Sequence, residues 1–155
     1  MLNTQDKIET FVTKEFKQEL KNCSIIKDGN AILLFDRYKI TPNKVGFTIS
    51  AIRLSESHMF YNIKSAVTFC IFEQYQSYDQ ANQVKNLDRI ISNQEFNVEL
   101  QQKLIKSKNT KEQKMIYLTK LTENLSKKKQ AKEQLDKLIN ISRALLDKKF
   151  SSNLK

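Results

Sequence analysis

The sequence predicts an α+β fold, in which a small head is followed by a long antiparallel helical hairpin. The 155-residue chain has only two glycines and one proline, so few elements are expected to be interrupted. Strand-like alternation is confined to the first half, whereas apolar residues in the second half recur at heptad spacing. We therefore expect an α+β head at residues 1–78, the coiled-coil-like hairpin at 79–150 and a disordered tail at 151–155.

The first element of the head is expected to be a helix over residues 4–21. Its apolar side chains, at positions 8, 11, 12, 16 and 20, fall on one helical face. Thr4 is a suitable N-cap for this helix, and Asp6 and Glu9 lie early enough to favour its dipole.

The next segment, residues 25–50, changes to the period of a β-sheet. The sequence Asp-Gly-Asn at 28–30 indicates a turn, and residues 31–40 are rich in β-branched and aromatic side chains. A second turn is expected at residues 41–44, because Pro42 stands where a type I turn favours it. Alternation then resumes at residues 45–49. We expect a small antiparallel β-hairpin or meander, with a short third strand at residues 58–61.

The helical period returns at Ile63 and predicts a core helix that lies on the hairpin strands. Its apolar stripe, at positions 63, 66, 67, 70 and 71, is widened by Phe69 and Phe72. Polarity rises at residues 76–79, where we expect the helix to kink or break. Asp79 is a candidate cap for a new helix.

Two heptad series follow, separated by a short polar segment in which Thr110 and Gln113 fit a capping box. Together they predict two antiparallel arms. The seam of the first arm is expected at Val84, Leu87, Ile91, Gln94, Val98, Gln101 and Ile105. The seam of the second arm is expected at Leu118, Leu121, Leu125, Lys128, Lys132, Leu135, Ile139, Ser142 and Leu146. Polar members of such a seam weaken the packing of the arms.

The formal charge of +10 is concentrated in the hairpin. Residues 101–155 hold 15 Lys/Arg and 5 Asp/Glu, whereas residues 1–100 hold 12 of each. The excess of lysine over arginine also fits an AT-rich genome, which weakens the charge as a functional signal. A lysine-rich surface either contacts nucleic-acid phosphates, meets an acidic partner, or only solvates the helices. The candidate contact residues are Lys103, Lys106, Lys108, Lys111, Lys114, Lys127, Lys128, Lys129 and Lys132.

No motif for catalysis, a cofactor or a metal is present in the sequence. The single histidine, His58, and the cysteines Cys23 and Cys70 lack metal-ligand spacing, and we expect both thiols to be reduced. There is no glycine-rich phosphate loop, and Asp88 and Glu95 resemble ordinary helix-surface groups. A site assembled from distant residues stays open. We expect no enzyme activity, no cofactor and no small-molecule substrate.

The chain also lacks an apolar run that could span a membrane and an apolar signal core at its N-terminus. We therefore expect no membrane contact and a cytosolic location.

A set of short motifs links the chain to phage proteins. These are LFDRYKI and GFTIS in the head, AVTFC followed by FE in the core helix, NLDR and MIYLTKL in the arms, and INISR with a final KKF. From about residue 34 onward, the chain resembles a family of small uncharacterised proteins of T4-like marine phages, cyanophages among them. The resemblance implies a phage gene product with no established activity, found in the cytoplasm of the infected bacterial host or in the virion. It transfers no functional residues.

Two functional hypotheses follow from these features. The first is a non-enzymatic structural or assembly protein of a tailed phage, whose hairpin docks on another protein or on a second copy of itself. The alternative is a basic accessory protein that contacts nucleic-acid phosphates through its C-terminal lysines.

Overall fold

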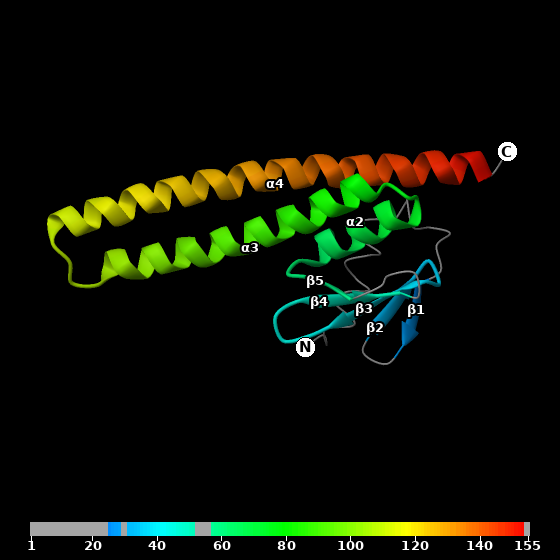
Figure 1. Ribbon diagram of the computed structural model, residues 1–155, viewed down its shortest axis with the longest axis horizontal. Coiled ribbons are helices and arrows are strands. Elements are labelled where there is room, and N and C mark those ends of the chain that lie inside the picture. The colour runs from blue at the N-terminus through cyan, green and yellow to red at the C-terminus, as the bar shows by residue number, and fades with distance from the viewer. Residues whose placement is uncertain (1–24, 29–30, 52–56, 154–155) are drawn as a thin grey trace.

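The computed structural model confirms the α+β fold, and it describes residues 25–28, 31–51 and 57–153. A small antiparallel sheet and one helix form the head, and two long helices extend from it as a hairpin (Figure 1). The helix expected at residues 4–21 and the turn residues Gly29 and Asn30 lie outside the described residues.

The sheet has five strands in sequence order: β1 (Ile25–Asp28), β2 (Ala31–Leu34), β3 (Tyr38–Pro42), β4 (Phe47–Ser50) and β5 (His58–Phe60). All four neighbouring pairs are antiparallel, so the sheet is a meander. The expected third strand at residues 58–61 is therefore present as β5. Gly46 precedes β4 and lies so close to β5 that a Cβ atom would meet the carbonyl oxygen of Phe60.

The segment 31–40, expected to form one strand, is in fact two strands joined by a turn. Phe35 and Asp36 both have positive φ angles, 59° and 54°, and the backbone N–H of Arg37 donates to the carbonyl of Leu34. This is the geometry of a type I′ turn, which normally selects glycine or asparagine. The sequence gives no warning of the turn, because a phenylalanine occupies its first central position.

The core helix is α2 (Ile63–Gln74), which begins and ends with regular caps. The Asn62 side chain accepts a hydrogen bond from the backbone of Lys64. At the other end, Gln76 has a φ of 61°, and the N–H groups of Gln76 and Ser77 donate to the carbonyls of Glu73 and Phe72. This is a Schellman motif, and it produces the break expected at residues 76–79. Ser77, rather than Asp79, is the N-cap of the next helix.

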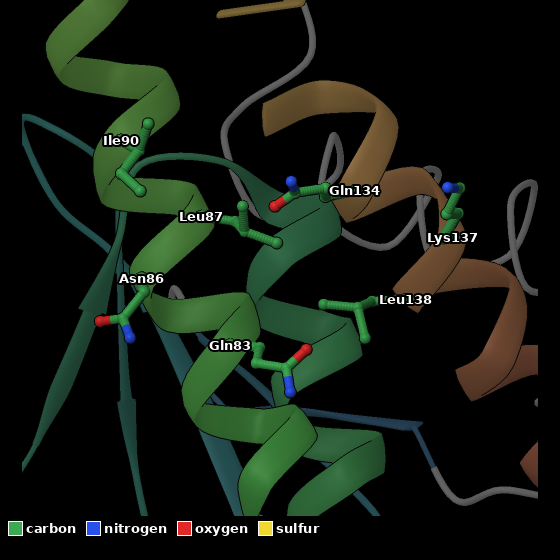
Figure 2. Close-up of a pocket in the computed structure, with 7 residues that line it drawn as sticks. All are labelled: Gln83, Asn86, Leu87, Ile90, Gln134, Lys137 and Leu138. Atoms are coloured by element: carbon green, nitrogen blue, oxygen red, sulfur yellow. The ribbon is translucent and has the colours of Figure 1, made fainter. Parts of the chain in front are cut away.

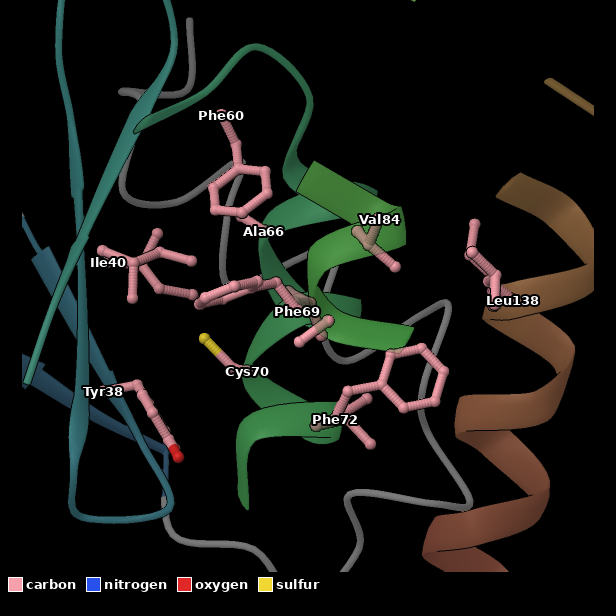
Figure 3. Packing of buried hydrophobic residues seen from close by; sticks show 14 of the residues in the cluster. Tyr38, Ile40, Phe60, Ala66, Phe69, Cys70, Phe72, Val84 and Leu138 are labelled. Carbon is pink, nitrogen blue, oxygen red and sulfur yellow. The ribbon is translucent and has the colours of Figure 1, made fainter. Parts of the chain in front are cut away.

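The core lies in layers, with the sheet on one side of α2 and the hairpin on the other (Figure 3). Ile40 and Tyr38 of the sheet point toward α2, whose Phe69 and Cys70 face them. Phe72 extends from α2 toward the hairpin. Because α2 is buried on nearly all sides, it joins the head and the hairpin into one hydrophobic core.

The hairpin consists of α3 (Tyr78–Lys106) and α4 (Lys111–Asn153). The predicted capping box is confirmed at the start of α4: the N–H of Gln113 donates to the Thr110 hydroxyl at 3.2 Å, and the N–H of Thr110 donates to the Gln113 side chain at 3.1 Å. Residues 151–153, expected in a disordered tail, continue α4, because no glycine or proline interrupts the helix there. Residues 154 and 155 lie outside the described residues.

The predicted seam is correct for α3 and partly wrong for α4. All seven seam positions of α3 are buried or half-buried. In α4 the buried or half-buried positions that repeat at heptad spacing along the whole pair are Tyr117, Leu121, Asn124, Lys128, Ala131, Leu135, Leu138, Ser142 and Leu145, and we take them as the seam toward α3. The seam positions predicted at Leu118, Leu125 and Lys132 are instead exposed. The error is one helical position, and it arises because large leucines were favoured over Asn124 and Ala131.

Candidate functional site

The most informative surface follows one side of α4. Side chains spaced by seven residues lie on the same side of a helix that packs in heptads. We call one such series the α4 stripe, and it consists of Lys111, Leu118, Leu125, Lys132, Ile139 and Leu146.

The two ends of the α4 stripe differ sharply in burial. Ile139 and Leu146 are 7% and 1% exposed, whereas Leu118 and Leu125 are 45% and 46% exposed. The buried pair lies beside the α3–α4 seam, and α2 contacts both arms. By contrast, Ile141 on the other side of α4 is 51% exposed. The side of the hairpin that carries the α4 stripe is therefore the side that α2 covers.

We call the part of the hairpin beyond the head the free end, comprising residues 93–106 of α3, the turn, and residues 111–132 of α4. It projects past the sheet and α2 (Figure 1). Its surface exposes an unusual number of large apolar side chains. They are Phe96, Leu100, Met115, Ile116, Leu118 and Leu125. Apolar side chains that gather on one face are typical of interaction surfaces, and among these six Leu118 and Leu125 share one face of α4.

The nine candidate lysines all lie on the free end, and eight of them are exposed. The five from Lys103 to Lys114 surround the turn, and the other four lie further along α4. They form no single patch, because Lys127, Lys128 and Lys129 are consecutive and point in directions about 100° apart. Lys128 is half-buried in the seam, with its ammonium group 3.7 Å from a carboxylate oxygen of Glu95. The free end holds ten lysines and four glutamates, a net charge of +6.

The seam of the free end is only partly apolar. Gln94 and Gln101 each bury a side-chain amide oxygen that has no hydrogen-bond partner among the described residues. Buried amides without partners cost free energy, so these two glutamines weaken the packing of the free end.

A second cluster of polar groups joins α3 to the head. Asp88 is buried, and its carboxylate accepts hydrogen bonds from the backbone N–H groups of Tyr61, at 2.8 Å, and Asn62, at 3.2 Å. Burial raises the pKa of Asp88, and these hydrogen bonds limit the rise. The expectation that Asp88 is an ordinary surface group is therefore wrong. Its partners are backbone groups of the β5–α2 connection, which gives it a structural role.

His58 lies beside this cluster, with its Nδ1 atom 2.8 Å from the ammonium group of Lys85. Its ring also packs against Phe69, with the ring centroids 5.1 Å apart. The ammonium group donates this hydrogen bond, so the Nδ1 atom is unprotonated in this contact. With one face of its ring against Phe69 and its Nδ1 atom beside Lys85, His58 is arranged as a packed histidine.

The titratable groups of the core are shielded from solvent. Burial raises the pKa of the Cys70 thiol well above its usual range and that of Tyr38 to about 12. A buried thiol with a raised pKa is a poor nucleophile, so Cys70 is suited to packing and not to catalysis. Burial also raises the pKa of Glu73.

A pocket of about 450 Å³ opens between α3 and α4, on the side of the hairpin opposite to α2. Leu87 and Leu138 point toward one another at its base, and Gln83 and Gln134 lie at its sides (Figure 2). Its polar groups are mostly neutral amides, with Lys137 the one charged side chain of its lining. Such a lining offers shape and hydrogen bonds but no acid–base pair.

Residues 25–28, 31–51 and 57–153 contain no group of three histidine, cysteine, aspartate or glutamate side chains arranged to hold a metal ion. Within the same part of the chain, no helix has a stretch long and apolar enough to cross a membrane.

No protein-family model matches this chain, and no curated protein or solved structure matches it either. The functional argument therefore depends on the surface of the molecule itself.

The sequence located the lysines of the free end but missed the α4 stripe as a surface. Leu118 and Leu125 were assigned to the seam, where they would be covered by α3. The sequence does signal a second stripe, because the neighbouring positions Tyr117, Leu121 and Asn124 have the same period, but it does not tell which of the two stripes faces α3. Two adjacent apolar stripes on one helix indicate that two different elements pack against it.

Proposed function

We propose that this protein is a non-enzymatic structural or assembly protein that docks on another protein through the free end of its helical hairpin. The observation that carries the proposal is the exposure of six large apolar side chains on a segment that projects beyond the head. Folded chains rarely leave so much apolar surface in water without a partner. The resemblance to proteins of T4-like marine phages favours a component of a tailed phage, present in the infected cell or the virion.

The contrast with the rest of the molecule supports this assignment. The head buries Phe60, Phe69 and Phe72 almost completely, although Val45, Met59 and Tyr61 are exposed on its surface. Its polar clusters, around Asp88 and His58, hold backbone and aromatic groups in place. These features favour a scaffold whose contacts are made by the hairpin.

The proposal can be tested by photo-cross-linking. A photoreactive amino acid at Leu118 is expected to give a cross-linked protein product in phage-infected cells, and the same amino acid at Lys44, an exposed residue of the turn between β3 and β4, is not. Sedimentation of the purified chain distinguishes a second copy from another protein as the cross-linked species. A chain that stays monomeric and gives no product from Leu118 would rule the proposal out.

A second function, phosphate binding by a nucleic-acid accessory protein, is favoured by one observation. Eight of the nine candidate lysines are exposed and available for contact. Replacing Lys127, Lys129 and Lys132 by glutamine is then expected to weaken binding to duplex or single-stranded DNA and to reduce its dependence on salt. Unchanged affinity in a titration at several salt concentrations would exclude this surface as the binding site.

A further inference from the structure

The side of the hairpin that carries the α4 stripe already holds one helix. Near the head, α2 contacts both arms, and Ile139 and Leu146 are buried in the core cluster that α2 shares with the hairpin. The helix begins at Ile63, where the preceding Asn62 is hydrogen-bonded to Asp88 of α3. Beyond this level, both arms continue toward the turn without a described element against them.

On this side of the hairpin, α3 and α4 form a groove between them. The part of the groove beyond α2 is long enough to hold a helix. After Asp88, α3 continues to Lys106, which is 18 residues further along the sequence. At 1.5 Å per residue these residues extend about 27 Å. A helix of roughly the same number of residues therefore fits in line with α2, with its apolar side chains over Leu118 and Leu125.

The charges around the groove select the kind of helix that fits. Lys111 and Lys132 belong to the α4 stripe and stand at either end of the exposed leucine pair. Lys106 and Lys129 lie near the same side by their helical positions. Glu95, which lies seven residues after Asp88 and 3.7 Å from Lys128, and Glu99 lie on this side of α3 as well, so lysines outnumber glutamates around the groove by a smaller margin than on the free end as a whole. A second copy of this chain would bring another free end with a charge of +6 against these lysines, which is repulsive. An acidic helix would instead be attracted.

We infer that the distal groove between α3 and α4 binds an acidic amphipathic helix of a partner protein, in line with α2. The inference rests on the proposed function and specifies the chemistry of its partner. The partner helix places apolar side chains at a spacing of three, four and seven residues over Leu118 and Leu125, and Asp or Glu side chains beside the flanking lysines. A groove that binds an amphipathic helix is a common mode of recognition. Within this molecule, α2 already packs against both arms in the same way.

The test uses the full-length chain and designed 18-residue helical peptides as probes. The acidic peptide carries leucines on one face and glutamates beside them, and the basic peptide has lysines in place of the glutamates. We expect the acidic peptide to bind in a fluorescence-anisotropy titration, and the affinity to fall as salt is added. The basic peptide is expected to bind at least about tenfold more weakly, because it meets like charges. Equal binding of the two peptides would overturn the inference.

Matched variants locate the binding surface. The double variant Leu118→Gln with Leu125→Gln removes the exposed leucine pair without adding charge and is expected to weaken peptide binding about tenfold or more. The control is Ile116→Gln with Ile141→Gln, which changes two similarly exposed apolar residues on other sides of α4. Circular dichroism checks that both variants remain helical. An equal loss in the control variant would contradict the assigned groove.

The failure of this inference differs from the failure of the proposed function. If the acidic peptide does not bind, but sedimentation shows a dimer that the Leu118→Gln and Leu125→Gln variant dissociates, the partner is a second copy and only the acidic helix is excluded. If the chain is monomeric and binds DNA but neither peptide, both the inference and the protein-docking function are wrong.

Discussion

The two halves of the α4 stripe are built from similar side chains but lie in different surroundings. Ile139 and Leu146 are buried in the core that α2 shares with the hairpin, whereas Leu118 and Leu125 remain exposed on the free end. The helix, the period and the residue types are the same in both halves. The comparison teaches that the amphipathic pattern of a helix indicates how many neighbours it has. Among the described residues, one of the two neighbours of α4 extends along only part of its length.

Substituting a phenylalanine of the head and one of the free end should give the largest difference in unfolding free energy. Phe69→Ala removes a ring that is 1% exposed and lies 5.0 Å from the ring of Phe60, so it should lower the free energy of unfolding by about 3–5 kcal/mol. Phe96→Ala, at a site 65% exposed on the free end, should change it by less than about 0.5 kcal/mol. Urea denaturation measures both. A large loss in the Phe96 variant would show that the free end is covered in solution.

The same comparison can be made within the α4 stripe. Ile139→Ala should cost about 2–4 kcal/mol of unfolding free energy, because it leaves a cavity beneath α2. Leu125→Ala should cost well under about 1 kcal/mol, since its side chain is nearly half exposed. If the two variants lose equal stability in urea denaturation, the α4 stripe is covered along its whole length.

A smaller loss of unfolding free energy is expected from a substitution at Asp88, which connects α3 to the head by hydrogen bonds. Asp88→Asn leaves one amide oxygen to serve two backbone N–H groups, which should cost about 1–3 kcal/mol of unfolding free energy. The effect depends on pH, because burial raises the pKa of Asp88 in the folded chain above the value of 3.8 for an exposed aspartate. The folded state therefore binds the proton more tightly than the unfolded state.

The sign of this dependence follows from the raised pKa. The stability contributed by Asp88 is fully present below the unfolded pKa and is lost as the pH rises through the folded pKa. The difference in unfolding free energy between the wild-type chain and the Asp88→Asn variant should therefore shrink as the pH is raised from about 4 to about 7. A difference that grows over this range would show that the carboxylate is stabilised by its hydrogen bonds more than it is destabilised by burial.

The smallest loss of stability is expected from a substitution in the capping box at the start of α4. Thr110→Ala removes one half of the capping box and should cost about 1 kcal/mol of local stability at the start of α4. Hydrogen exchange of the amides in the first turn of α4 measures this loss. Thr119→Ala is the control, because its hydroxyl donates to the Met115 carbonyl within the helix and alanine favours helices. Faster exchange in the control would mean that the tip is unstable for another reason.

Regular periodicity explains what was predictable from the sequence. The core helix from Ile63, the seam of α3 and the capping box at Thr110 each repeat or combine residues a few positions apart, and local patterns report them well. The turn at Phe35 and the buried Asp88 were not predictable. The turn uses a residue that does not favour it, and Asp88 finds its partners 26 and 27 positions away, in a connection that only the folded chain brings near.

The candidate surface was predictable in composition but not in place. The lysines of the free end were predictable, because charged residues can be counted along the sequence. Which of two adjacent apolar stripes on α4 faces α3 depends on the position of α2, and no local pattern contains that information. The same limit explains why Leu118 and Leu125 were assigned to the seam.

The heptad seam of the hairpin also fixes the distance between the head and the turn. Because the seam repeats every seven residues, inserting one heptad into each arm would move the turn about 10 Å further from the head and keep the same side of the hairpin facing a bound helix. Inserting four residues in each arm would shift the register and turn that side away. The hairpin length thus sets both how far from the sheet a partner is held and which way it faces.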